Sequence, residues 1–599
     1  MISDPEILFQ LGAIMLLAFI AATVAGKVSQ SVMIGYIVIG ILIGPKISIE
    51  LFGMEYHGLI SDMTLIGILS FVGLVMLMFF VGLEFSFSKL KKTRTPAIIL
   101  AVIDTSVGLF VGFTFASFLG WPLIDSIFLA GVIAMSSTSI AMKILFDLKR
   151  MSSPEVEFLI GLVVVETFIA MLILSVTSGM IVQPDADPMA YGRLLLGMAA
   201  FYGFFVWIAM WAIPRVVKFF NSIENDELFI LFALGIVFLT AGLAAVMGVP
   251  AIIGAFFVGM ILAESKVSQR IQSKLESFKD AFVAIFFTSF GMMIDPAMFG
   301  TAAWMVVLAI PLVVMYEGLV MSIVSYFMGF SSRASATIGT SLCGRGVESV
   351  LYASVGSSVK AATMGSQLNA FAGLFCFGMS AVSTPLVKHS ARLAGAIARA
   401  IPQSVKFSGA VVSRTLGKAV MPSQLKLFKG ARTTGILLMA FVPACVGILM
   451  TTGLIHWSFV AAGAAVTVAF AFVVRYEVRD IARHVNYANI GVSSNDREPI
   501  VILVSVVVIG AILSVLAITS VWSLIWQVSL LVAFVYVVSV LSVMSWAHKQ
   551  LYVGAPGMPE KVFVLKCSPG IEESPGDDLI DVPKPVYGVV KAMPTEPND

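Results

Sequence analysis

Long apolar segments follow one another along most of this chain, and short polar loops separate them. A helix needs about 20 apolar residues to cross the roughly 30 Å hydrocarbon core of a bilayer. The pattern predicts thirteen membrane spans, near residues 7–26, 31–44, 63–83, 97–119, 123–146, 156–182, 194–217, 227–246, 250–264, 279–295, 302–328, 334–357 and 365–387. Four more are predicted near 433–454, 457–474, 498–519 and 522–545.

Two of these spans are interrupted at their centres by polar residues. The fifth contains Ser136–Ser139, and the twelfth contains Cys343–Ser349. Backbone at membrane depth leaves the helical conformation only where it is buried in protein or lines a wet cavity. Broken helices at corresponding places in two halves of a chain mark the transport site of secondary transporters. The interruptions therefore predict a transport site where the two spans meet.

The composition is that of an all-α polytopic membrane protein. Hydrophobic residues make up 59% of the 599 residues, charged residues 12%, and the mean hydropathy is +1.00. The four cysteines are scattered, so neither a disulfide framework nor a bound metal is predicted. No H-E-x-x-H, G-x-S-x-G or strand-associated G-x-G-x-x-G motif occurs. We therefore expect no enzyme activity, no cofactor, no nucleotide-binding domain and no nucleic-acid partner.

Basic residues follow every second span, while the alternate loops are acidic or neutral. By the positive-inside rule, the N-terminus lies outside and the C-terminus in the cytoplasm of a multi-pass protein of the cell membrane. Residues that carry the prediction include Lys91, Lys149, Arg215, Arg270 and Arg333 on the cytoplasmic side, and Asp125 and Asp185 on the other.

The same patterns divide the chain into four parts. Residues 1–390 form the predicted transmembrane core, and 391–432 a basic amphipathic linker. Residues 433–550 form an accessory region with four spans. The remaining residues, 551–599, form an acidic, proline-rich cytoplasmic tail that is expected to be mostly disordered.

Few ionisable side chains lie inside the spans, and each costs at least about 2.5–3.5 kcal/mol at the bilayer centre. Glu166 is a candidate proton-titrating group, with a carboxylate fixed in an ion pair as the alternative. Arg345 is either a fixed countercharge or a structural partner of Glu348 or Glu317. We expect it within ion-pair reach of Glu166, Glu317 or Glu348. Asp104 and Glu317 are open between packing and function.

Hydroxyl groups crowd the first interruption. Ser136, Ser137, Thr138 and Ser139, together with freed backbone carbonyls, can coordinate a partly dehydrated alkali cation, because hard cations prefer oxygen ligands. In an unbroken helix, these hydroxyls would instead bond back to the carbonyl four residues earlier.

Four stretches resemble the Kef-type monovalent cation:proton antiporters, the cation:proton antiporter-2 group with the Na⁺/H⁺ exchanger fold. The residues from Ser136 to Met142 resemble the S-S-T-x-I-A-M segment of that family. Gly254–Ser265 resembles G-A-F-x-A-G…L-A-E-S, and Phe286–Asp295 resembles F-F-x-S-x-G-M…D. Arg345 and Gly346 resemble the start of R-G-E-F-S, so the likeness covers about residues 5–390.

The resemblance implies a thirteen-helix core made of two inverted repeats. Spans four to six and eleven to thirteen would form a moving unit, in which the two broken helices cross at the ion site. The other spans would form the scaffold of a homodimer. Transport would proceed by alternating access, with a monovalent cation, Na⁺ or K⁺, and a proton competing for one carboxylate.

The chain departs from the family pattern in two places. Twenty-eight residues after Thr138 the family has Gln, Asn, Asp or Glu followed by a nearly universal Asp, whereas here Glu166 precedes Thr167. Glu166 is then expected to take over the role of the aspartate. The acid after Arg345 is also displaced, to Glu348. The alternative function is an uncoupled cation pathway or a membrane sensor that has lost proton coupling.

Overall fold

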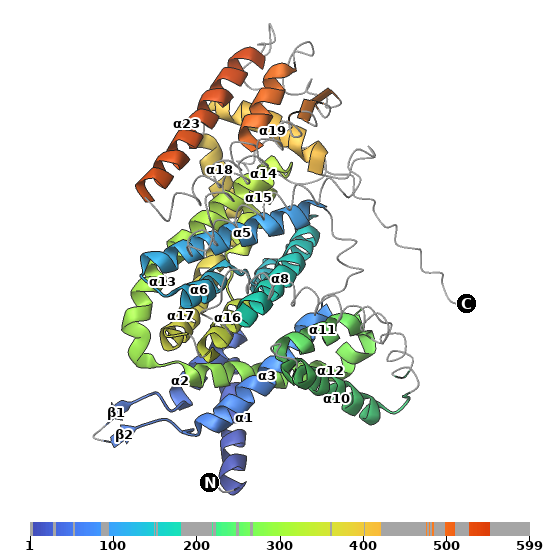
Figure 1. Cartoon of the computed structure of the whole chain (residues 1–599), viewed down its shortest axis with the longest axis vertical. Coiled ribbons are helices and arrows are strands. Elements are labelled where there is room, and N and C mark those ends of the chain that lie inside the picture. The colour runs from blue at the N-terminus through green and yellow to red at the C-terminus, as the bar shows by residue number, and fades with distance from the viewer. Residues whose placement is uncertain are drawn as a thin grey trace.

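The computed structural model describes most of the chain up to residue 420 and parts of the remainder (Figure 1). The described residues are 4–27, 31–51, 54–84, 95–148, 150, 154–180, 219, 223–246, 251–263, 268–359, 362–400, 402–420, 475, 478–479, 482–483, 497–508 and 526–551. The predicted seventh span, the first two accessory spans and the tail lie outside them.

Helices occupy the predicted spans throughout the described chain before residue 390. They are α1 (Asp4–Lys27), α2 (Val32–Ile43), α3 (Met63–Glu84), α5 (Thr95–Phe118), α6 (Leu123–Ala134), α7 (Thr138–Asp147), α8 (Pro154–Met180), α10 (Asp226–Val246), α11 (Ala251–Ala263), α12 (Ser268–Met293), α13 (Phe299–Val313), α14 (Ser322–Phe327), α15 (Ser332–Leu342), α16 (Val347–Ser358) and α17 (Gly365–Lys388). Among the described residues, six helical segments are long and apolar enough to cross a membrane. The chain is thus a helical membrane protein.

Both predicted interruptions are confirmed. The fifth span is divided into α6 and α7, with Met135–Ser137 between them. The twelfth is divided into α15 and α16, with Cys343–Gly346 between them. The polar residues in the sequence therefore mark true breaks in the helices.

Three short elements were not predicted. A hairpin of β1 (Ile49–Leu51) and β2 (Met54–Tyr56) joins α2 to α3, with Ile49 opposite Tyr56. A 3₁₀ turn, η1 (Pro296–Met298), precedes α13. Between α13 and α14 the helix widens into the π-helical segment η2 (Val314–Met321). Segments of this kind occur frequently at functional sites.

The helices pack in two groups (Figure 1). One contains α1, α2, α3, α10, α11 and α12, and the other contains α5 to α8 and α13 to α17. Within the first group α3 and α11 touch backbone to backbone, because a Cβ on Gly82 would lie 2.1 Å from the Phe256 carbonyl oxygen. A Cβ on Gly259 would lie 2.2 Å from the Phe79 carbonyl oxygen. Small residues permit such close approach of membrane helices.

Between the two groups lies an apolar seam with a cavity of about 10 Å³. Side chains of α3, α8 and α11 line it: Met78, Met171, Leu174, Ile252, Ile253, Phe256 and Phe257. The seam therefore joins α8 to the first group through dispersion contacts.

Long-range contacts bring together the loops that the charge pattern assigns to one side. Arg150 donates to the Val387 carbonyl (3.3 Å), which joins the ends of the fifth and thirteenth spans. Arg270 donates to the Ile223 carbonyl (2.8 Å), which joins the loop after the ninth span to the loop after the seventh. The sidedness of Arg270 relative to a bilayer stays a prediction, and Lys91 and Asp185 lie outside the described residues.

The opposite ends of the spans are joined in the same way. The carboxylate of Asp125, in the first turn of α6, accepts hydrogen bonds from the Thr363 N–H and hydroxyl (both 3.2 Å) and from the Met364 N–H (3.0 Å). These residues lie just before α17. The loop after the fourth span and the loop after the twelfth therefore lie together. The alternation of basic and acidic loops places both on the same side of the membrane.

Beyond residue 390, α18 (Ser390–Ala400), α19 (Gln403–Val420) and α23 (Trp526–Leu551) are described. In α19, the Ser413 hydroxyl donates to the Tyr326 carbonyl in α14 (2.6 Å), and the Ser408 hydroxyl donates to the Met544 carbonyl in α23 (2.7 Å). The linker helix α19 thus lies between the end of the eleventh span and the last helix of the accessory region. The proposed boundaries at 390, 432 and 550 stay predictions.

Candidate ion-binding site

The two helix breaks, Met135–Ser137 and Cys343–Gly346, meet at a point that we call the crossing. The Ser137 N–H donates to the Gly344 carbonyl (2.8 Å), and the Ser349 hydroxyl donates to the Met135 carbonyl (3.3 Å). A Cβ on Gly346 would lie 2.3 Å from the Ser137 hydroxyl oxygen. The approach of the two breaks therefore requires a glycine at position 346.

Glu166 of α8 binds directly to the first break. Its Oε1 accepts a hydrogen bond from the Ser136 N–H (2.7 Å), and its Oε2 accepts one from the Ser136 hydroxyl (2.5 Å). Only 1% of Glu166 and 3% of Ser136 are exposed. The N–H groups at a helix start have no partner within the helix and carry a partial positive charge. The Glu166 carboxylate binds the break two residues before α7 begins, where its negative charge is favourable for that end of the helix.

Arg345 is fully buried, and all of its donors have acceptors. A guanidinium has five N–H groups. Its Nε donates to the Ile133 carbonyl (2.9 Å), and Nη1 donates to the Leu342 (2.7 Å) and Gly344 (3.2 Å) carbonyls. Its Nη2 donates to the Tyr316 hydroxyl (2.6 Å) and forms an ion pair with Glu317. The guanidinium has no donor left for a further carboxylate.

These charges match the dipoles of the broken helices. Arg345 lies at the C-terminal ends of α6 and α15, where it binds the carbonyls of Ile133 and Leu342. Glu166 lies at the start of α7, and Glu348 is in the first turn of α16. Positive charge is favourable at helix C-termini and negative charge at N-termini. Each of the four helix ends at the crossing therefore faces a charge of the favourable sign.

The π-helical segment η2 supplies two of the groups around Arg345. Tyr316 and Glu317 are adjacent in sequence, and both bind Arg345 Nη2. The Tyr316 hydroxyl also donates to the Ile133 carbonyl (3.1 Å), which Arg345 Nε shares. The segment begins three residues after Pro311, which cannot donate a backbone hydrogen bond.

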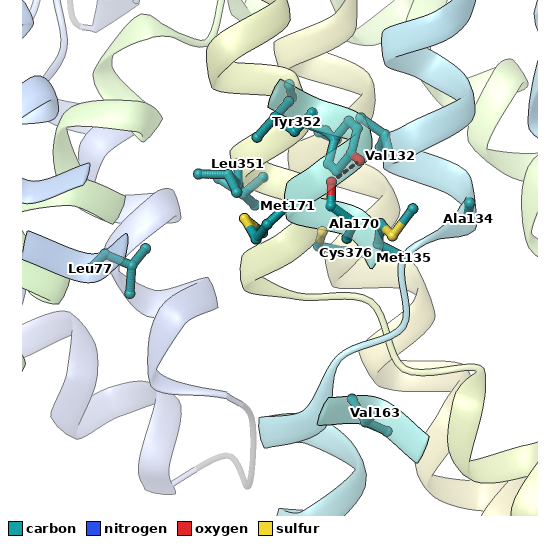
Figure 2. Close-up of a cluster of buried hydrophobic side chains, with 14 of the residues drawn as sticks. Leu77, Val132, Ala134, Met135, Val163, Ala170, Met171, Leu351, Tyr352 and Cys376 are labelled. Atoms are coloured by element: carbon teal, nitrogen blue, oxygen red, sulfur yellow. Dashed lines mark hydrogen bonds between the residues drawn. The ribbon is translucent and has the colours of Figure 1, made fainter. Parts of the chain in front are cut away.

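A tyrosine outside the crossing fixes α8 relative to α16. The Tyr352 hydroxyl donates to the Ala170 carbonyl (2.6 Å), as Figure 2 shows. Ala170 lies one helical turn after Glu166, and Val163 and Met171 of α8 lie in the same buried cluster (Figure 2). This bond holds the helix that carries the Glu166 carboxylate.

The structure brings most of the predicted site residues together. Arg345 lies within ion-pair distance of one of the three predicted carboxylates, as expected, and that partner is Glu317. The other hydrogen bonds of the guanidinium go to the Tyr316 hydroxyl and to backbone carbonyls. Thr167 is buried beside Glu166, with 9% of its surface exposed.

The structure also shows where three other predicted site residues lie in the chain. Asp104 of α5 is fully buried. Thr138 and Ser139 lie in the first turn of α7, and their side chains are outside the described residues.

Tyr316 and Tyr352 were not among the residues predicted from the sequence. Both are polar only at the end of a large apolar side chain, and composition does not separate them from residues of the core. The one available signal was the position of Tyr316 next to Glu317 inside a span.

A family model described as "Sodium/hydrogen exchanger, transmembrane" matches residues 14–388, which is more than half of the chain. The chain belongs to this family. Its curated relatives include the K⁺/H⁺ antiporter subunit KhtU of Bacillus subtilis, which is 31% identical over 394 residues, covering 65% of this chain and 94% of the relative. The Ammonium/H⁺ antiporter subunit AmhT of Alkalihalophilus pseudofirmus is 27% identical over 362 residues, covering 60% and 88%.

A third relative and one solved structure also match. The Na⁺/H⁺-K⁺ antiporter GerN of Bacillus cereus is 25% identical over 354 residues, covering 59% of this chain and 88% of the relative. The solved structure of the sodium proton antiporter MjNhaP1 from Methanocaldococcus jannaschii aligns with a TM-score of 0.49 and 15% identity, covering 65% of this chain and 97% of that one.

The family resemblance seen in the sequence is thereby confirmed, and so is monovalent cation:proton antiport as the activity of the family. The uncoupled pathway or sensor finds no support among these matches. Members of this family are transporters, which agrees with the expectation that the chain is not a conventional enzyme.

Proposed function

We propose that this chain exchanges Na⁺ or K⁺ for protons by alternating access and that Glu166 binds the two ions in turn. The observation that carries the proposal is the difference between the two buried acids near the crossing. Glu317 is held in an ion pair with Arg345, whereas Glu166 accepts hydrogen bonds from the uncharged Ser136 N–H and hydroxyl. A carboxylate in such a site is free to exchange a proton for a cation.

The chemistry of Ser136 fits both states. A hydroxyl can donate one hydrogen bond and accept others. While Glu166 is ionised and no cation is bound, the Ser136 hydroxyl donates to it. When a cation binds, the hydroxyl rotates and offers its oxygen, together with the carboxylate and the hydroxyls of Ser137, Thr138, Ser139 and Thr167. A proton on Glu166 removes the charge that holds the cation, so the two ions exclude each other.

Arg345 has a structural role in this proposal. Its charge compensates Glu317 and the carbonyl ends of α6 and α15, which keeps the two breaks together. Glu348 compensates the start of α16. The charge on Glu166 is therefore left for the transported ion.

The proposed movement is a displacement of α5–α8 and α13–α17 against α1–α3 and α10–α12. The apolar seam between the groups supports it, because dispersion contacts do not fix one register. In this proposal the core has thirteen spans in two inverted repeats, the first group forms a homodimer interface, and both the linker and the tail are cytoplasmic. Residues 433–550 add four accessory spans.

Glu166→Gln tests the proposal. Proteoliposomes that hold the purified chain and a quenched pH-sensitive dye should show dequenching on addition of Na⁺ or K⁺, and Glu166→Gln should lose it. Glu155→Gln makes the same chemical change at the start of the same helix and serves as the matched control. Normal ion-driven proton movement by Glu166→Gln would place the chemistry at another residue.

A further inference from the structure

One buried acid near the crossing has no role in the exchange described so far. Asp104, in the middle of α5, has no exposed surface. Neither of its carboxylate oxygens has a hydrogen-bond partner among the described residues. Glu166 and Glu317 have such partners. Within the described part of the chain, the ionised form of Asp104 would therefore have no hydrogen-bond donor to stabilise it.

Asp104 faces the crossing. The helix α5 packs against α6, α8 and η2. One turn after Asp104, a Cβ on Gly108 would lie 3.0 Å from the Tyr316 hydroxyl oxygen and 3.0 Å from Ala134. Residues four apart lie on one face of a helix, so Asp104 and Gly108 are both on the face of α5 that lies against the two breaks.

The charged groups that act on Asp104 come from every element around it. Glu317 of η2 and Glu166 of α8 repel its ionised form, and Arg345 attracts it. Two further titratable groups, Tyr316 and Cys343, also interact electrostatically with Asp104. The acid of α6, Asp125, lies at the outer end of that helix, where it binds the Thr363 and Met364 N–H groups.

The buried positive charge near Asp104 is already balanced by other groups. The charge of Arg345 is matched by Glu317, with which it is paired. The negative charge of Glu166 is neutralised alternately by the transported cation and by a proton. An ionised Asp104 would add a buried negative charge to which none of the described residues donates a hydrogen bond, and the one cation near it, Arg345, is already paired with Glu317. A buried carboxyl group in this position becomes neutral instead.

We propose that Asp104 is a second proton-binding carboxylate of the site, and that it keeps its proton throughout the cycle. The inference rests on the proposed role of Glu166. Glu166 releases its proton when the cation binds and takes one up when the cation leaves, while the Asp104 carboxyl group stays unchanged. One proton then moves for each cation, and the exchange transfers no net charge.

Infrared spectroscopy tests the protonation of Asp104 without relying on transport. At alkaline pH and with saturating cation, Glu166 is ionised, so the remaining carbonyl band of a protonated carboxylic acid should come from Asp104. This band should shift in D₂O, persist in Glu166→Gln and disappear in Asp104→Asn. Its absence in the wild-type chain, or its persistence in Asp104→Asn, would overturn the proposal.

The transport ratio gives a second test, which needs only the wild-type chain. Reversal of proton movement in proteoliposomes with opposed pH and cation gradients should give one proton per cation. A membrane potential set with a thiocyanate gradient should leave the rate unchanged. A ratio of two protons per cation would contradict the inference even if Asp104→Asn failed to fold.

The pH profile separates a constant proton from an exchanged one. Asparagine is neutral, like the protonated acid, so Asp104→Asn should keep its half-maximal exchange at the wild-type pH, whatever its maximal rate. A displacement of a whole pH unit, about tenfold in proton affinity, would show that Asp104 is ionised in at least part of the cycle and would overturn the proposal. If the wild-type chain showed no cation-driven proton exchange, or if Glu166→Gln exchanged normally, the result would instead count against the proposed function.

Discussion

Ser136 donates two hydrogen bonds to the Glu166 carboxylate, one from its backbone N–H (2.7 Å) and one from its hydroxyl (2.5 Å). A residue of one broken span thus binds both oxygens of the acid on the next span. The backbone bond depends on the break in the helix, and the hydroxyl bond depends on the side chain. Substitution at position 136 can therefore separate the geometry of the site from its ligand chemistry.

Ser136→Ala should weaken cation binding and keep the fold of the break. It removes one oxygen ligand of the proposed cation site, but it leaves the backbone N–H in place. The half-saturating cation concentration, measured by dye dequenching, should rise roughly tenfold or more. Ser357→Ala removes a hydroxyl that bonds within α16 (3.0 Å to the Ser354 carbonyl) and is the control. Equal half-saturation in wild type and Ser136→Ala would show that the hydroxyl is not a ligand.

Arg345→Ala should lower both stability and transport. Removal of one partner of a buried ion pair costs about 3–5 kcal/mol, and here it also removes the hydrogen bonds of the guanidinium to the Ile133 and Leu342 carbonyls. Thermal unfolding in detergent, followed by fluorescence-detected size exclusion, should show a lower midpoint. Arg479→Ala breaks the half-exposed pair with Glu498, for which about 0–1 kcal/mol is expected. Similar midpoints for these two variants would contradict the structural role of Arg345.

Tyr352→Phe should reduce exchange without abolishing it. The change keeps the aromatic ring and removes the bond to the Ala170 carbonyl, worth about 1 kcal/mol. Because this bond holds α8, the loss should raise the half-saturating cation concentration as well as lower the unfolding midpoint. Tyr536→Phe loses a comparable bond to the Val507 carbonyl (2.9 Å) in the accessory region and should affect the midpoint alone. If Tyr352→Phe lowered only the unfolding midpoint and left the half-saturating cation concentration unchanged, Tyr352 would not position Glu166.

Thr167→Asp should tighten cation binding. A second negative charge about 4 Å from the cation contributes about 4 kcal/mol at an effective dielectric of 20, and a third of that is already tenfold in affinity. The variant carries a second exchangeable charge, so its exchange should become sensitive to membrane potential. Thr167→Asn, which is uncharged, should do neither. An unchanged affinity in Thr167→Asp would indicate that position 167 does not reach the ion.

The sequence predicted the parts of the site that depend on local polarity. The breaks at Ser136 and Arg345 stand out because polar residues are rare in apolar spans, and Glu166 stands out for the same reason. The choice of Glu317 over Glu166 or Glu348 as the partner of Arg345 was not predictable, because it depends on how η2 lies against the crossing. Helix periodicity carries no information about such contacts between distant segments.

The π-helical turn and the hairpin were missed for a different reason. The residues of η2 are as apolar as those of an ordinary helix, apart from Glu317, so no pattern in the sequence distinguishes the wider turn. The strands β1 and β2 contain three residues each, fewer than a periodic pattern needs to be recognised.

The hydrogen bonds of Arg345 also restrict how the molecule can work. One guanidinium joins the end of α6 to the end of α15, and these helices are far apart in the sequence. If the breaks slid past each other, both sets of bonds would be lost at once, and Arg345 has no exposed surface at which water could replace them. In the proposed cycle, the two broken helices would therefore move as one unit, and access to each side of the membrane would open between that unit and the helices it moves past.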